Sequence, residues 1–212
     1  MMAAMTLWVS GRVLPFFTKA RLQVAIRAAP ALLKPLSMTA TWLLIPALIF
    51  NYLMPDSVVM KTLLALIALI AAVTHAISLG YMFKVGVKDE PMLWSLYMAY
   101  GWIITGYLVL AINQISSMSA NWLHAITIGG LLGMILSMMA RISLGHTGRK
   151  ITALRGISIA FILIQLATLI RIGLMSNIGF ILAIAMVLVA MMIFLYHYTT
   201  ILIRPRADGR PD

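Results

Sequence analysis

Four histidines carry most of the chemistry that this 212-residue sequence could perform. His75, His124 and His197 lie in or beside long apolar runs, and His146 lies between two glycines in the stretch RISLGHTGRK. A histidine in a membrane span usually faces a bundle interior or a cavity, where it forms hydrogen bonds, relays protons or binds a metal. Imidazole suits both copper and the axial position of haem iron. The sequence contains no cysteine, which excludes disulfides, thiolate metal sites and cysteine nucleophiles.

Three of these histidines also have a structural interpretation. His75 lies about nine residues, or about 13 Å, from the helix end at Lys84. It either acts as a ligand or proton relay or forms an interhelical hydrogen bond that satisfies its ring. His124 is either a ligand or an interfacial histidine bonded to a neighbouring helix or to water. For His197 the pattern favours a snorkelling or aromatic-stacked ring over a metal ligand.

The composition places these residues in a membrane. Hydrophobic residues make up 63% of the chain and charged residues 10%, and apolar runs of about 20 residues recur along it. We therefore predict an all-α fold, a polytopic integral membrane helical bundle with six transmembrane helices plus a partial N-terminal one. The predicted spans are 39–54, 62–83, 92–112, 122–140, 151–170 and 178–203; residues 1–11 are expected to be the end of a truncated helix and 12–36 a cytoplasmic basic segment.

Lysine and arginine gather in alternate loops, and this distribution orients the chain. Under the positive-inside rule the 12–34 loop, the loop around His146 and the C-terminus lie in the cytoplasm, and the 113–121 loop lies outside. The net charge of +11 therefore reflects topology and contact with the lipid bilayer, not nucleic-acid binding. The cytoplasmic groups are Arg12, Lys19, Arg21, Arg27 and Lys34; Lys84 and Lys88; Arg141, Arg149, Lys150 and Arg155; Arg204, Arg206 and Arg210, whereas the intervening loops hold Lys61 and Arg171.

Several stretches together resemble the NnrS family. They are GRVLPFFTKA at 11–20, THAISLG at 74–80, WLHAITIGGLLGMILSMMARISLGHTGR at 122–149 and RPRADGRP at 204–211, and the third is highly specific. The resemblance implies a multi-pass protein of the bacterial inner membrane, associated with haem and copper and with the response to nitric oxide. It further implies that His75, His124 and His146 bind the cofactor.

The resemblance covers the C-terminal half of that family. A motif rich in tryptophan and histidine, typical of the family's N-terminal half, is absent from this sequence. We therefore expect a split or truncated member, or a partner chain or homo-oligomer that supplies the rest. Two other functions stay open: a small-solute or metal transporter that uses the same histidines, and a non-catalytic partner subunit.

Helix geometry decides which histidines could share a site. His124 and His146 are 22 residues apart on nearly one continuous helix, which separates them by about 33 Å, so they cannot bind one metal. The helices that carry His75 and His197 cross the membrane in the same direction, and the two histidines lie at similar depth. A bis-histidine haem or a paired copper site between these helices is therefore allowed. If His75, His124 and His146 all bind, at least two sites are needed.

The helix after His124 carries a stripe of small residues. Ala125, Gly129, Gly133 and Ser137 recur every four residues, and Arg141 continues the line. The stripe predicts close approach of another helix, with room for a flat macrocycle as the alternative. Arg141 is expected to neutralise a haem propionate, to pair with an acidic group, or to snorkel to the lipid headgroups.

The loop after Arg141 is the most polar part of the chain. Gly145 and Gly148 predict tight turns around His146, and Thr147 is expected to cap the next helix. The first amides of that helix, together with Arg149, would favour an anion. A plain cytoplasmic turn in contact with lipid headgroups is the alternative.

Overall fold

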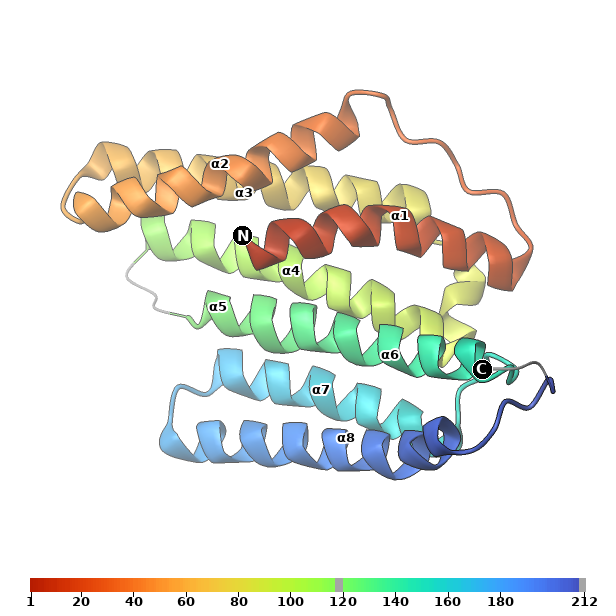
Figure 1. Cartoon of the computed structure of the whole chain (residues 1–212). Coiled ribbons are helices and arrows are strands. Elements are labelled where there is room, and N and C mark those ends of the chain that lie inside the picture. Colours follow the sequence, from red (N-terminus) through yellow and green to blue (C-terminus); the bar gives the residue numbers. More distant parts are fainter. Residues whose placement is uncertain (117–119, 210–212) are drawn as a thin grey trace.

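The computed structural model describes residues 1–116 and 120–209, without the side chain of Arg155. Its described residues form helices and contain no β-strand, which confirms the predicted all-α class (Figure 1). The elements are α1 (Met2–Leu22), α2 (Leu33–Leu53), α3 (Val58–Met82), the short 3₁₀ turn η1 (Val85–Asp89), α4 (Pro91–Ile115), α5 (Trp122–His124), the π-helical stretch η2 (Ala125–Leu132), α6 (Gly133–His146), α7 (Arg155–Gly173) and α8 (Asn177–Ile203).

Six helices within the described residues are long and apolar enough to cross a membrane, as predicted. The α5, η2 and α6 segments form one of them, Trp122–His146. The main difference lies at the N-terminus, where α1 continues to Leu22 through part of the predicted basic segment 12–36. The helix persists because Leu14 and Thr18 are fully buried against the bundle while the charged side chain of Arg12 stays exposed.

Ser57 caps α3, because its hydroxyl accepts a hydrogen bond from the Met60 amide. The predicted cap at Thr147 is wrong, since α7 begins only at Arg155. The Thr147 hydroxyl instead donates to the Ser143 carbonyl at 2.7 Å and thereby helps to satisfy the end of α6.

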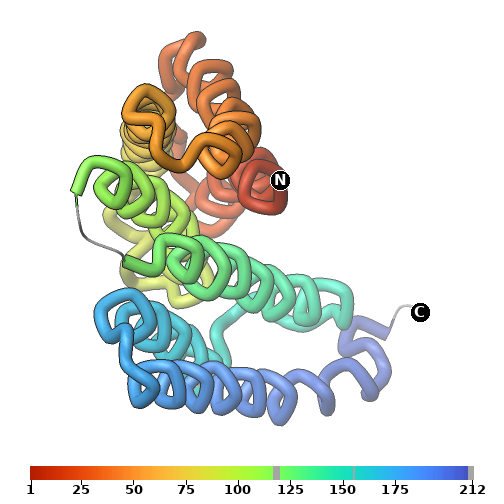
Figure 2. Tube along the Cα trace, turned by 90° about the vertical axis from the view of Figure 1, so that its left-hand side faces the viewer, coloured from red at the N-terminus to blue at the C-terminus, as the bar shows by residue number. Residues whose placement is uncertain are grey.

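The helices pack largely in chain order. Each of α2 to α4 packs on the next, α4 packs on η2 and α6, and α7 lies between η2 and α8. Figure 2 shows α1 to α3 gathered at one end of the bundle and α7 and α8 at the other. Two hydrophobic cores result, one among α1 to α4 and one among α6 to α8, and α6 contributes Met134 to the first and Leu136 to the second.

Glycines allow α4 and η2 to approach closely. An added Cβ on Gly129 would run into the Trp102 indole, and one on Gly130 would run into Ile103. All five residues of the predicted stripe, from Ala125 to Arg141, are buried. The predicted close helix contact is therefore confirmed, and side chains of α4 occupy the space that a macrocycle along the stripe would need.

This seam predicts a large effect of Gly129→Val. Trp102 cannot move aside freely because its indole N–H donates to the Gln165 side chain at 2.5 Å. We expect the variant to lose about 1–3 kcal/mol of stability, the usual cost of overpacking. Denaturant unfolding in mild detergent measures the loss, and Gly11→Val is the control, because nothing lies within 4 Å of a Cβ at Gly11. Equal stability of the two variants would contradict the tight seam.

Candidate functional site

His75 is fully buried at the centre of a polar network. Its Nε2 lies 2.9 Å from the Thr41 hydroxyl of α2, and its Nδ1 lies 2.7 Å from the Tyr100 hydroxyl of α4. Because Thr41 also donates to the Ser37 carbonyl at 3.0 Å, the arrangement that satisfies every group has His75 Nε2–H donating to Thr41 and Tyr100 donating to Nδ1. Both ring nitrogens are therefore used to join α2, α3 and α4. This geometry matches the interhelical interpretation, and a metal at either nitrogen would have to replace one of the two bonds.

His124 lies in a different environment. It lines a cavity of about 230 Å³ between η2, α7 and α8, in which Arg171 is the other polar side chain. His124 Nδ1 is buried and forms no hydrogen bond within the described residues, and the same holds for Arg171 Nε. The Arg171 guanidinium lies over the Phe180 ring, 5.4 Å from its centroid. The cavity is thus lined by an imidazole and a cation in an otherwise apolar wall.

The backbone next to His124 is unusual. The π-helical stretch η2 begins at the following residue, and π-helical turns are rare and often mark functional sites. The Asn121 side chain ties this end of the helix to α7 by donating to the Arg171 carbonyl at 3.3 Å. The local structure therefore holds His124 and Arg171 at one wall of the same cavity.

Arg141 is buried, and among the described residues it neither reaches the headgroups nor pairs with an acidic group. Only 5% of its surface is exposed, so it does not snorkel to the headgroups. One Nη donates to the Met92 carbonyl at 3.2 Å, and the guanidinium lies 4.3 Å from the centroid of the Phe17 ring. Glu90, which directly precedes α4, pairs with Arg21 at 2.9 Å. Arg141 therefore connects α1, α4 and α6 through a carbonyl and an aromatic face.

The loop at 145–149, which we call the GHTGR loop, packs against the C-terminal segment at the end of α6. Arg206 donates to the His146 carbonyl at 2.8 Å, and the Ala207 amide donates to the Thr147 carbonyl at 2.9 Å. Gly148 adopts the predicted turn with φ +68°, and a Cβ there would run into Asp208. His146 itself is exposed.

Arg149 closes the same junction. Its guanidinium donates to the Thr147 carbonyl at 3.3 Å and to the Ile201 carbonyl of α8 at 3.4 Å. The predicted anion site at the start of the next helix is not formed, because α7 begins six residues after Arg149. These hydrogen bonds hold the loop, the C-terminal segment and the end of α8 together.

The structure does not bring the histidines together. The helix of His75, α3, packs on α1, α2 and α4, whereas that of His197, α8, packs on α6 and α7 (Figure 1). The paired site that helix geometry allowed for these two histidines is therefore not formed. His197 lies directly over Gly156 of α7, where a Cβ would run into its ring, and this fits the packing interpretation. Within the part of the chain that is described, no three His, Cys, Asp or Glu residues group closely enough to hold a metal.

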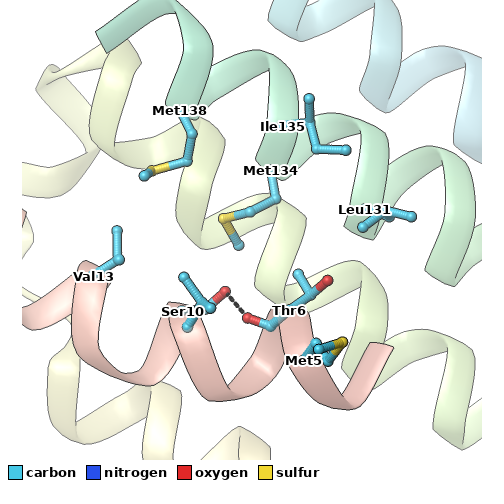
Figure 3. Close-up of a pocket in the computed structure, with 9 residues that line it drawn as sticks. Met5, Thr6, Ser10, Val13, Leu131, Met134, Ile135 and Met138 are labelled. Atoms are coloured by element: carbon cyan, nitrogen blue, oxygen red, sulfur yellow. Dashed lines mark hydrogen bonds between the residues drawn. The ribbon is translucent and has the colours of Figure 1, made fainter. Parts of the chain in front are cut away.

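Methionines gather in one place. Met5 of α1 and Met134 and Met138 of α6 line a cavity of about 270 Å³, into which their side chains point (Figure 3). Thioethers can bind soft metals, but methionine is also the usual filler of irregular apolar gaps. The hydroxyls in the wall are satisfied within α1, since Ser10 donates to the Thr6 carbonyl. We assign these residues to packing.

Sequence patterns identified His124 but not Arg171, which lines the same cavity. Arg171 counts as an ordinary loop charge in the sequence, because it follows the apolar run 151–170. The available signal was its isolated position outside the predicted basic loops, at the end of a predicted span, because an arginine close to a span usually pairs with a neighbouring group.

One family comparison covers nearly the whole chain. The family described as NnrS protein matches residues 1–206. No curated protein and no solved structure matches the chain.

Proposed function

The chain belongs to the NnrS family, and from this premise we propose that it is a membrane protein of the bacterial response to nitric oxide that carries haem or copper. The resemblance links the family to both cofactors and to nitric oxide. Bound haem iron or copper would supply a centre that binds nitric oxide and exchanges electrons. We place the protein in the inner membrane with its C-terminus in the cytoplasm, because the basic loops fall on that side.

The observation that carries this proposal is the buried Nδ1 of His124, which has no hydrogen-bond partner within the described residues. A buried polar atom without a partner is costly, and a ligand that coordinates it removes the cost. A neutral imidazole is the usual axial ligand of haem and a common ligand of copper. His124 is therefore the residue that would hold the cofactor.

Arg171 favours haem over copper at this position. A guanidinium pairs strongly with a carboxylate such as a haem propionate, whereas it repels a metal cation close to it. The cavity of about 230 Å³ is smaller than the pockets that enclose drug-sized ligands, so it would surround only part of a haem. His124 would hold the metal of the cofactor, and Arg171 would hold an acidic group of it.

The other histidines contribute less to this proposal. His75 already uses both ring nitrogens, His197 packs on Gly156, and the side chain of His146 is exposed at the far end of the helix from His124. Arg141 and Arg149 bind backbone carbonyls. A second site that uses His75 or His146 remains a prediction from the resemblance.

The visible absorption spectrum and the metal content of protein purified in mild detergent test this function. We expect a Soret band that survives washing and about one iron per chain. Copper in place of iron, without a Soret band, would keep the metal but overturn the choice of haem. A folded preparation without iron, copper or colour, which also fails to take up added haem or copper, would overturn the proposal.

A further inference from the structure

A second candidate binding site is a groove along α4 that no described histidine lines. A groove of about 770 Å³ runs between α3 and α7, with α4 as its floor, and we refer to it as the α4 groove. Its walls include Gly80 and Phe83 of α3 and Gln165 of α7. Its floor includes Gly101 and Trp102 of α4. It is the size of a pocket for an extended organic ligand.

The polar groups of the α4 groove are satisfied inside the protein. Trp102 donates to Gln165, and the Tyr97 hydroxyl donates to the Met82 carbonyl at 2.7 Å. The Thr105 hydroxyl donates to the Gly101 carbonyl at 3.0 Å. The groove therefore suits an apolar occupant, because it offers little polar surface that still needs a partner.

Cations lie at one end of the groove. A second hollow of about 300 Å³ shares Gly80 and Phe83 with it and is also lined by Arg27 and Lys84. Neither cation pairs with a described carboxylate: Glu90 pairs with Arg21, and Arg27 lies over the Tyr81 ring, 5.3 Å from its centroid. By the charge distribution this is the cytoplasmic end of α3. The arrangement is an apolar slot that opens beside two positive charges at a membrane surface.

Two glycines keep the slot open. A Cβ at Gly80 or at Gly101 would meet nothing within 4 Å, so neither packing nor backbone geometry within the described chain requires glycine there. Glycine destabilises a helix interior relative to alanine, and in membrane helices it normally serves close helix contacts. These two positions contact no helix through the missing Cβ, so the room they leave is available to a ligand.

We propose that the α4 groove and its cationic end bind one anionic phospholipid of the cytoplasmic leaflet, with an acyl chain along α4 and the phosphate between Arg27 and Lys84. From Tyr97 to Thr105 the floor extends about 12 Å at 1.5 Å per residue, close to the hydrocarbon depth of about 15 Å of one leaflet. Anionic lipids concentrate at the cytoplasmic surface, where basic side chains attract them. Haem fits this groove less well, because no described histidine lines it, and a neutral quinone would gain less than a charged phosphate from two cations.

Native mass spectrometry of the protein extracted from vesicles of equal parts phosphatidylglycerol and phosphatidylcholine tests the proposal. We expect one retained phosphatidylglycerol per chain and at least about tenfold lower retention in Lys84→Gln and in Gly80→Leu. The matched controls are Lys88→Gln, an exposed lysine in η1 that lines neither hollow, and Gly173→Leu, a glycine with an equally open Cβ position at the outer end of α7. Both controls should retain the lipid as the unchanged protein does.

Two results would contradict the proposal, one for the cations and one for the groove. Equal retention of phosphatidylcholine would overturn the role of charge, and unchanged retention in Gly80→Leu would overturn the groove. Should Gly80→Leu fail to fold, brominated phospholipids replace it: brominated phosphatidylglycerol should quench Trp102 fluorescence more than brominated phosphatidylcholine, and Trp102→Phe should remove that difference. Equal quenching by the two lipids would overturn the proposal.

Discussion

We expect His75→Ala to lose about 3 kcal/mol of stability, the largest loss among the four histidines. The substitution leaves a cavity at a fully buried position, and large-to-small changes in cores typically cost about 2–5 kcal/mol. It also leaves the Thr41 and Tyr100 hydroxyls without their imidazole partner. Interhelical hydrogen bonds in membranes average only about 0.6 kcal/mol, so most of the loss comes from the cavity. Unfolding in mild detergent, followed by circular dichroism, measures it.

Tyr100→Phe and Thr41→Val separate the two contributions. Each removes one hydroxyl with little change in volume, so each should cost about 1 kcal/mol or less. In a double-mutant cycle, Tyr100→Phe should have a smaller effect in the His75→Ala background than in the unchanged protein. A stable His75→Ala protein that has lost its cofactor would reverse this assignment and make His75 the ligand.

We expect His124→Ala to retain its fold and lose haem. The ring is partly exposed and forms no hydrogen bond through Nδ1 within the described residues, so its removal should change stability by about 0.5 kcal/mol or less. Loss of an axial ligand should lower the haem retained after washing by at least about tenfold. The haem content per chain, read from the Soret band, and a parallel unfolding curve measure both effects.

His197→Ala and Arg171→Gln serve as matched variants for His124→Ala. His197 packs over Gly156 far from the His124 cavity, so its removal should leave the haem content unchanged. Arg171 lines the cavity but offers no imidazole, so Arg171→Gln should weaken retention while the position of the Soret band stays the same. An unchanged haem content in His124→Ala would show that another residue holds the cofactor.

The membrane spans could be predicted from sequence because lipid requires long apolar helices with internally satisfied backbones. Their ends were less predictable where polar residues are buried by packing. The helix before the GHTGR loop continues past the predicted end at residue 140 because Arg141 is buried against Phe17 and Met92. The helix before Leu33 continues for a similar reason, since Thr18 bonds to the Tyr97 hydroxyl across 79 residues.

The candidate site was predictable only in part. The sequence identifies His75 and His124 as buried or interfacial imidazoles, but their partners come from segments 25 to 47 residues away, and no local pattern specifies which helix packs beside which. The π-helical stretch after His124 also leaves no signal in residue type. The distinction between a histidine that holds helices together and one with a free nitrogen therefore required the three-dimensional arrangement.

Titration of haem into cofactor-free protein, followed by absorption in the Soret region, tests the central claim most directly. The unchanged protein should saturate at one haem per chain, and His124→Ala should show only the spectrum of free haem at the same concentrations. Saturation of both proteins at one haem per chain with the same band would contradict the claim that His124 binds the cofactor.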